Sequence, residues 1–231
     1  DYAFSNAPLS AKAYGKAIQY WDALHGEDAW PNYFFNNHDT SRSTTRFAKG
    51  DSDAIPKLLL AMQLSVRGTP YLYYGEEIGM RDISLTRAQI QDPFGKHYWP
   101  FYKGRDGCRS PMQWSAQPNA GFTTGEPWLP VNKDYQVRNV ASQSGSSASM
   151  LTFYKELIAL RKAHPALNAG SIELIQADDP DLLIYQRTFG DEKMLIVLNF
   201  SAEIANYQLP TDDFNKWELL YAGNEPLTSQ M

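Results

Sequence analysis

The order of apolar and polar positions in the first third of the chain predicts helix, strand, helix and strand. Ser10 is a suitable N-cap, and apolar residues then recur at helical spacing until Gly26. The apolar runs 33–35 and 71–74 predict two short buried strands. Between them, one apolar stripe at helical spacing predicts the second helix: Ile55, Leu58, Leu59, Met62 and Val66.

Both predicted strands lead directly into polar residues, at 36–39 and at 75–77. Helices that alternate with strands imply a parallel sheet covered by helices, either an open sheet or a closed barrel. Ligands of such folds bind at the carboxyl ends of the strands. We therefore expect the chemistry of this protein at these two polar segments.

Residues 75–147 show little helical or strand periodicity and contain many Gly, Pro, Asn and aromatic residues. A compact domain rarely keeps so long an irregular connection unless the connection is functional. Disordered linkers are poor in aromatic residues, so an active-site loop fits this composition better. Aromatic rings stack on the apolar faces of sugars but also fill ordinary cores, and composition alone leaves both roles open.

The last third of the chain changes from helix to strand. Leu151, Tyr154 and Leu157 lie on one helix face, and His164-Pro165 ends that helix. Short apolar runs separated by turn residues follow, and they predict strands at 172–175, 182–188, 194–200, 204–209 and 217–221. This pattern is typical of an all-β module, and we expect an antiparallel sandwich.

Composition and charge exclude several classes of protein. The 231 residues are 43% hydrophobic, which is enough for one or two globular domains. A net charge of −5 argues against nucleic acid as the main partner, and no apolar run approaches the roughly 20 residues of a membrane-spanning helix. Cys108 is the only cysteine, so there is no intrachain disulfide framework, and we expect a cytoplasmic protein.

Four segments, in order along the chain, resemble signatures of the alpha-amylase superfamily. Residues 35–42 (FNNHDTSR) resemble the signature at the end of the seventh barrel strand, and residues 68–80 (GTPYLYYGEEIGM) resemble the eighth-strand signature. Residues 104–114 (GRDGCRSPMQW) and 120–125 (AGFTTG) are similar to segments of its alpha-glucosidase and oligo-1,6-glucosidase branch. One His-Asp pair would be a weak signal, but four ordered motifs are specific.

This resemblance implies an α/β fold, namely the C-terminal part of a (β/α)8 TIM barrel followed by an all-β sandwich domain. Residues 1–168 would be the barrel part, with the long loop after strand eight at about 75–147, and residues 169–231 the antiparallel β domain. The chain begins with Asp1 instead of Met and its β module stops short of an expected last strand. We therefore expect a missing N-terminal half of the barrel as a partner, and a truncated C-terminus.

The resemblance also implies a retaining cleavage of glucosidic bonds. That reaction needs two carboxyl groups about 5 Å apart, one as nucleophile and one as acid/base. In this family a third carboxylate grips sugar hydroxyls and stabilises the positive transition state. The motif places Asp39 in this third role, with His38 beside it as a hydroxyl ligand. The nucleophile and the acid/base would precede Asp1, and no cofactor or metal site is expected here.

Three arginines are further candidate substrate ligands. By resemblance, Arg105 pairs with an upstream Asp and binds the non-reducing end of the substrate, for which a planar guanidinium is suited. Arg109 is a second candidate, and Arg42 either reaches the substrate or holds its own loop. Adjacent Glu76 and Glu77 point in different directions, so we expect one of them to support the loop as a structural hydrogen-bonding group.

The function that follows is retaining hydrolysis of alpha-glucosidic bonds at the non-reducing end of short oligosaccharides, such as maltose-type glucosides. The chain alone is expected to be inactive. Two alternatives stay open: an enzyme of the same family that transfers or isomerises glucosyl groups, and a catalytically inactive barrel that binds a partner. The sequence does not decide between α-1,4 and α-1,6 bonds, nor does it give a Ca²⁺ requirement or an oligomeric state.

Overall fold

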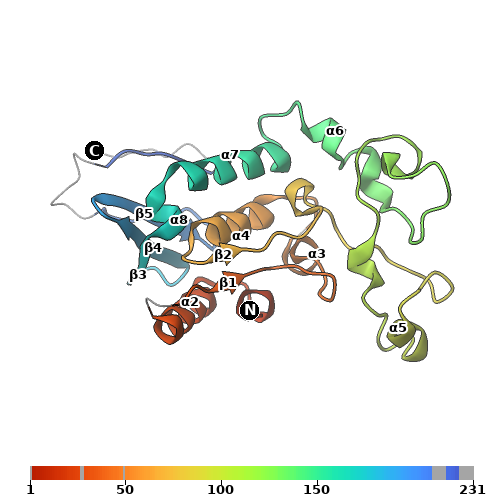
Figure 1. Cartoon of the computed structure of the whole chain (residues 1–231), viewed down its shortest axis with the longest axis horizontal. Coiled ribbons are helices and arrows are strands. Elements are labelled where there is room, and N and C mark those ends of the chain that lie inside the picture. Colours follow the sequence, from red (N-terminus) through yellow and green to blue (C-terminus); the bar gives the residue numbers. More distant parts are fainter. Residues whose placement is uncertain (1, 27–28, 49, 210–216, 224–231) are drawn as a thin grey trace.

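The computed structural model describes residues 2–26, 29–48, 50–209 and 217–223 (Figure 1). Two short strands form its centre, β1 (Asn32–Tyr33) and β2 (Thr69–Pro70), which pair in parallel with Asn32 opposite Thr69. The helices of this half are α1 (Ala3–Asn6), α2 (Ala11–His25), α3 (Ser43–Phe47) and α4 (Ala54–Ser65).

The first predicted helix and its two ends are confirmed. The Ser10 hydroxyl accepts a hydrogen bond from the backbone N–H of Ala13 at 3.2 Å, which caps α2. The helix ends at Gly26, whose positive φ of 56° is readily adopted only by a residue without a Cβ.

The strand expected at 71–74 is wrong, because β2 ends at Pro70. The backbone N–H of Tyr71 still donates to the carbonyl of Tyr33 at 2.9 Å, and the parallel ladder ends there. Among the described residues, β1 and β2 have only each other as sheet neighbours, so the ladder extends no farther than their contact. Phe35 after β1 is 2% exposed and lies in the core, as its apolar run predicts.

Helix α4 is buried on two faces, although the sequence stripe predicted only one. Leu59, Met62 and Val66 belong to a core shared with α2 and β1. On the other face, Leu60 and Leu64 pack against α7 (Met150–Ala163). The predicted helix after residue 150 is thereby confirmed, and it covers α4 from the outside (Figure 1).

The C-terminal module is an antiparallel sheet in the order β3-β4-β5. Its strands are β3 (Ser171–Ile175), β4 (Leu182–Phe189) and β5 (Glu192–Asn199). A short helix that the sequence did not predict, α8 (Pro165–Ala169), precedes it, with Pro165 at the first helical position. The strands predicted at 204–209 and 217–221 are wrong, because both segments are described and neither is a strand. Ile204 is 95% exposed, so the first of these lacks the buried face that a sandwich strand requires.

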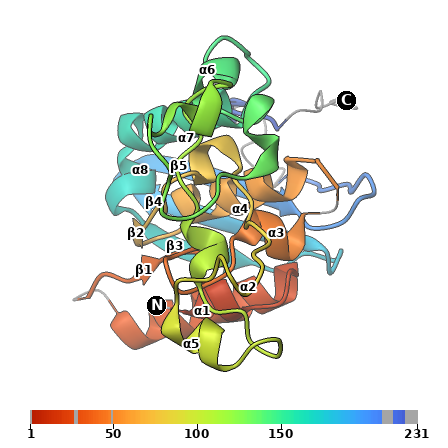
Figure 2. The same ribbon diagram turned by 90° about the vertical axis from the view of Figure 1, so that its right-hand side faces the viewer.

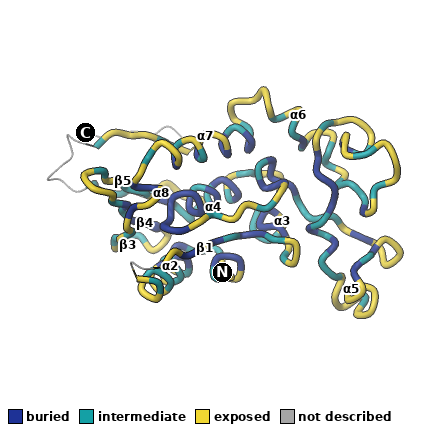
Figure 3. The backbone as a smooth tube through the Cα atoms, in the orientation of Figure 1, coloured by how far each residue is buried: buried dark blue, intermediate teal, exposed yellow. Residues whose placement is uncertain are grey.

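The long segment after β2 is irregular, as predicted. It carries only short helices: η1 (Glu76–Ile78), α5 (Pro93–His97), η2 (Asp106–Arg109), η3 (Pro118–Gly121), η4 (Lys133–Gln136) and α6 (Val140–Gln143). The β domain and this segment lie at opposite ends of the molecule (Figures 1 and 2). The outer turns of the long segment are exposed, while most of α4 is buried (Figure 3). In the described part of the chain, no helix is long and apolar enough to cross a membrane.

Two buried arginines connect the β domain and α7 to the end of α4. Arg187 of β4 is 0% exposed and donates to the carbonyls of Ser65, Ser171 and Gly170 at 2.5–2.9 Å. Arg161 of α7 donates to backbone carbonyls of the same region, those of Leu64, Val66 and Gly68. Burial, together with the charge of Arg161, lowers the pKa of Arg187 to about 10. The guanidiniums thus satisfy carbonyls at and after the C-terminal end of α4.

The substitution Arg187→Leu should therefore destabilise the fold strongly. It leaves three carbonyls without their donor, and we expect the free energy of unfolding to fall by about 3 kcal/mol. Urea-induced unfolding of the full-length protein measures this change. Arg87→Leu is the control, because Arg87 is exposed and its replacement should have little effect. Equal effects of the two substitutions would show that Arg187 does not stabilise the contact between the β domain and α4.

Glu76 is the buried carboxyl group of the central region. It is 9% exposed, and it accepts hydrogen bonds from the Asn36 side chain and, at 2.9 Å, from the Tyr154 hydroxyl. Burial raises its pKa to about 7, and these hydrogen bonds and the charge of Arg42 counter only part of that rise. Gly75 before it has a φ of 83°, and a Cβ there would lie 2.4 Å from the Met80 sulfur, so only glycine fits this approach.

The raised pKa of Glu76 predicts a pH-dependent stability. The unfolded chain releases this proton near pH 4.5 and the folded chain near pH 7, so the folded state binds more protons between these values. The contribution of Glu76 to stability is therefore complete below the lower pKa and is lost as the pH rises to the upper one. We expect Glu76→Gln to remove this part of the pH dependence of the unfolding free energy, measured by urea unfolding of the full-length protein at several pH values. Glu126→Gln, at an exposed site, should retain it.

Candidate active site

The segment after β1 presents Asp39 on a fixed turn. The Asn37 side-chain oxygen accepts the backbone N–H of Asp39 at 2.8 Å and the hydroxyl of Thr40, and Asn37 and Thr40 form an isolated bridge. The side chain of Asp39 is 37% exposed. The turn therefore holds the backbone while the carboxylate stays accessible.

Two guanidiniums and one imidazole converge on the Asp39 carboxylate. Its Oδ1 accepts from Arg105 Nη1 at 3.1 Å and from Arg109 Nη2 at 3.0 Å, and its Oδ2 lies 3.3 Å from His38 Nε2. Arg109 Nε also donates to the His38 carbonyl at 2.7 Å. The structure thus brings together four of the five predicted site residues, from segments about 70 positions apart in the sequence.

Arg105 is held in place by Asp92, which the sequence did not reveal. The Asp92 carboxylate is 0% exposed and accepts from Arg105 Nε at 2.9 Å, from Nη2 at 3.3 Å and from the Arg105 backbone N–H at 2.9 Å. These charged hydrogen bonds lower the pKa of Asp92 to about 2, and the same bonds raise the pKa of Arg105. Arg105 therefore faces Asp39 from a fixed, permanently charged anchor.

A second carboxylate that the sequence did not reveal, Asp106, fixes the backbone at Asp92. Asp106 is fully buried, and its Oδ2 accepts the backbone N–H groups of Gln91 and Asp92 at 2.6 and 2.7 Å. Asp92 also caps α5 through the N–H of Phe94. The Asp-Pro pair at 92–93 is a helix-start signal that could have drawn attention to this residue.

Arg42 occupies a different place from the other arginines. It is 1% exposed, and its guanidinium donates to the carbonyls of Tyr74 at 2.7 Å and Cys108 at 3.0 Å. Its expected role as a substrate ligand is thereby corrected, because the group is enclosed between the two loops. The geometry supports the other role considered for it, which is to hold the loop after β1 against the loop after β2.

An open groove of about 400 Å³ lies beside Arg109. Aromatic side chains form part of its wall, namely Tyr74, Trp114, Phe122 and Trp128. Asp39 does not line it, so the groove adjoins the charged cluster through Arg109 alone. Among the residues that the structure describes, no group of three His, Cys, Asp or Glu side chains could hold a metal ion. The cluster around Asp39 therefore presents charged hydrogen-bond donors and an acceptor at the surface next to the groove.

Comparison with known proteins identifies the family. The catalytic domain of alpha amylase matches residues 2–170, and the C-terminal domain of maltogenic amylase matches residues 172–228. A probable alpha-glucosidase of Rhizobium meliloti is 42% identical over 185 residues, which are 79% of this chain and 33% of the relative. Oligo-1,6-glucosidase of Parageobacillus thermoglucosidasius is 35% identical over 94% of this chain and 42% of its own length.

A solved structure gives the same result. The alpha-glucosyl transfer enzyme XgtA superposes with a TM-score of 0.84 at 34% identity, over 91% of this chain and 39% of that enzyme. The chain thus spans about 40% of the length of most of these relatives. The resemblance and the fold class expected from the motifs are confirmed. The chain belongs to the alpha-amylase family, as a C-terminal part of its (β/α)8 barrel followed by an antiparallel β domain.

Proposed function

We propose that this chain contributes the third carboxylate and the substrate-binding arginines of a retaining alpha-glucosidase. The enzyme would remove glucose from the non-reducing end of short oligosaccharides such as maltose-type glucosides. The strongest support is the convergence of Arg105, Arg109 and His38 on the exposed carboxylate of Asp39. The names of the relatives, alpha-glucosidase and oligo-1,6-glucosidase, agree with this activity.

Each residue has a defined task in this proposal. Asp39 accepts hydrogen bonds from hydroxyls of the glucose being cleaved, and its charge stabilises the oxocarbenium-like transition state more than the ground state. His38 donates to a neighbouring hydroxyl. Arg105, fixed on Asp92, closes the pocket at the non-reducing end, so that only a terminal glucose fits. Arg109 balances the charge of Asp39 at the edge of the aromatic groove.

The remaining parts of the reaction need residues that this chain does not provide. We propose that an N-terminal half of the barrel supplies the nucleophile and the acid/base, and that the barrel part (residues 1–168) and the β domain (residues 169–231) meet at α8. We also place the enzyme in the cytoplasm, on the basis of its single cysteine.

A second activity has a specific observation in its favour. The solved relative with a TM-score of 0.84 is described as an alpha-glucosyl transfer enzyme, and transfer uses the same carboxylates with a sugar instead of water as acceptor. The aromatic groove beside Arg109 would suit such an acceptor. Product analysis separates the two activities, since transfer or isomerisation yields new glucosides and hydrolysis yields free glucose. An inactive, partner-binding barrel would yield neither.

The complete enzyme should depend on the Asp39 carboxylate. We expect Asp39→Asn to lower kcat by about a hundredfold to a thousandfold, because the amide cannot supply negative charge to the transition state. Folding should change little, since exposed ion pairs contribute little stability. Asp51→Asn is a matched control that also breaks an Asp–Arg pair, at an exposed site. If the two variants hydrolyse a chromogenic alpha-glucoside equally well, Asp39 does not belong to the active site.

The chain alone should be inactive and poorly folded. Residues 1–231 lack the proposed nucleophile and acid/base, and the two-stranded parallel sheet leaves edges that can pair with other chains. The test is to express these residues alone, record circular dichroism and thermal unfolding, and assay the same chromogenic glucoside. Turnover at ordinary enzyme rates would refute this expectation.

A further inference from the structure

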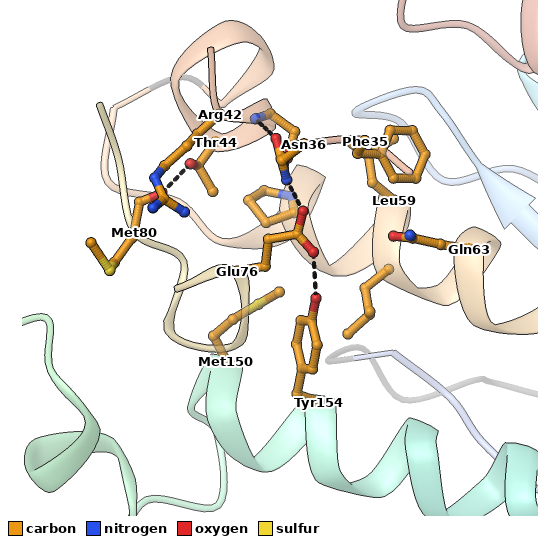
Figure 4. Close-up of a pocket in the computed structure, with 13 residues that line it drawn as sticks. Phe35, Asn36, Arg42, Thr44, Leu59, Gln63, Glu76, Met80, Met150 and Tyr154 are labelled. Atoms are coloured by element: carbon orange, nitrogen blue, oxygen red, sulfur yellow. Dashed lines mark hydrogen bonds between the residues drawn. The ribbon is translucent and has the colours of Figure 1, made fainter. Parts of the chain in front are cut away.

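Glu76 lies in the interior between the loop of Asp39 and helix α7 (Figure 4). One carboxylate oxygen accepts from Nδ2 of Asn36, and the other accepts from the Tyr154 hydroxyl at 2.9 Å. All three side chains are less than a tenth exposed. Glu76 is therefore enclosed away from any substrate, and it can act on the site only through its two partners.

Asn36 joins the two ends of the loop that carries Asp39. Its Oδ1 accepts the backbone N–H of Ser43, and its Nδ2 donates to the Ser43 hydroxyl at 3.1 Å as well as to Glu76. His38 and Asp39 lie inside the loop that this contact closes. Because Asn36 precedes His38 and Asp39, and Ser43 begins α3 just after them, the position of the amide sets the position of the segment between them.

The carboxylate also determines which way the Asn36 amide points. Both Glu76 oxygens accept hydrogen bonds, from Asn36 Nδ2 and from the Tyr154 hydroxyl, so the NH₂ side of the amide must face Glu76. The oxygen side is then left for the Ser43 N–H, which is the arrangement observed. The adjoining cavity of about 20 Å³ has room for about one water molecule. If one of these bonds is lost, the Asn36 amide and Glu76 therefore have few other hydrogen-bond partners within reach.

We infer that Glu76 is a positioning residue for Asp39: its carboxylate orients Asn36, and Asn36 fixes the loop on which Asp39 is presented. The inference rests on the proposed catalytic role of Asp39. Tyr154 is the third member, because its hydroxyl ties Glu76 to α7 and so connects the loop to the buried core formed by α4 and α7.

Exchanging the donor and the acceptor of the Asn36–Glu76 hydrogen bond tests this inference in the complete enzyme. Asn36→Asp places two carboxyl groups against each other, and we expect kcat to fall by about tenfold to a hundredfold with little change in KM. Adding Glu76→Gln restores a donor that faces an acceptor, so the double variant should recover most of the lost kcat. A merely structural role predicts no such recovery in folded protein.

Two matched tyrosines keep the test decisive even if Asn36→Asp does not fold. Tyr154→Phe removes the second bond to Glu76. Tyr185→Phe removes a buried hydroxyl of the β domain that bonds Ser65 at the end of α4. Both should lower Tm, but only Tyr154→Phe should lower kcat measured well below Tm. Equal kcat values for the two variants, or failure of Glu76→Gln to rescue folded Asn36→Asp, would overturn the inference.

Asp39→Asn in the same assay separates this inference from the proposed function. If Asp39→Asn is inactive while Asn36→Asp and Tyr154→Phe keep full kcat, the catalytic role of Asp39 stands and the positioning role of Glu76 fails. If Asp39→Asn is fully active, the proposed function itself fails, whatever the effect of the other variants.

Discussion

The ion pair between the buried carboxylate of Asp92 and the partly exposed Arg105 is the constraint on which the site depends. A carboxylate without solvent contact needs its charge balanced, and Arg105 balances it through three hydrogen bonds. Only one guanidinium nitrogen, Nη1, is left to face Asp39. The long loop after β2 can therefore be irregular over most of its length and still present this one donor at a fixed place.

The rest of the molecule supports the two loops that meet there. Arg42, in the loop after β1, donates to the carbonyls of Tyr74 and Cys108 in the loop after β2. Glu76 connects the loop of Asp39 to α7 through its bonds to Asn36 and Tyr154. Helix α4 contacts α7 on one face and the β domain on the other, where Arg187 binds its last carbonyl, that of Ser65. The β domain thus shares one hydrophobic core with the barrel part.

Sequence motifs predicted the residues that face solvent at the site better than the residues that hold them. Asp39 and Arg105 belong to recognisable motifs. Asp92 contacts Arg105 only because the loop between them folds back, and no local sequence pattern predicts that contact. The long helices α2, α4 and α7 were predicted well because caps and apolar spacing are local signals. The strands at 71–74 and 204–209 were not, because a strand exists only where a neighbour pairs with it.

The most direct measurement is a structure of the complete enzyme with a non-hydrolysable maltose analogue bound. We expect Asp39 and Arg105 each to contact hydroxyls of the terminal glucose, while Arg105 keeps its bonds to Asp92. A sugar bound elsewhere, with Asp39 still fully occupied by Arg105 and Arg109, would refute the proposed role of Asp39.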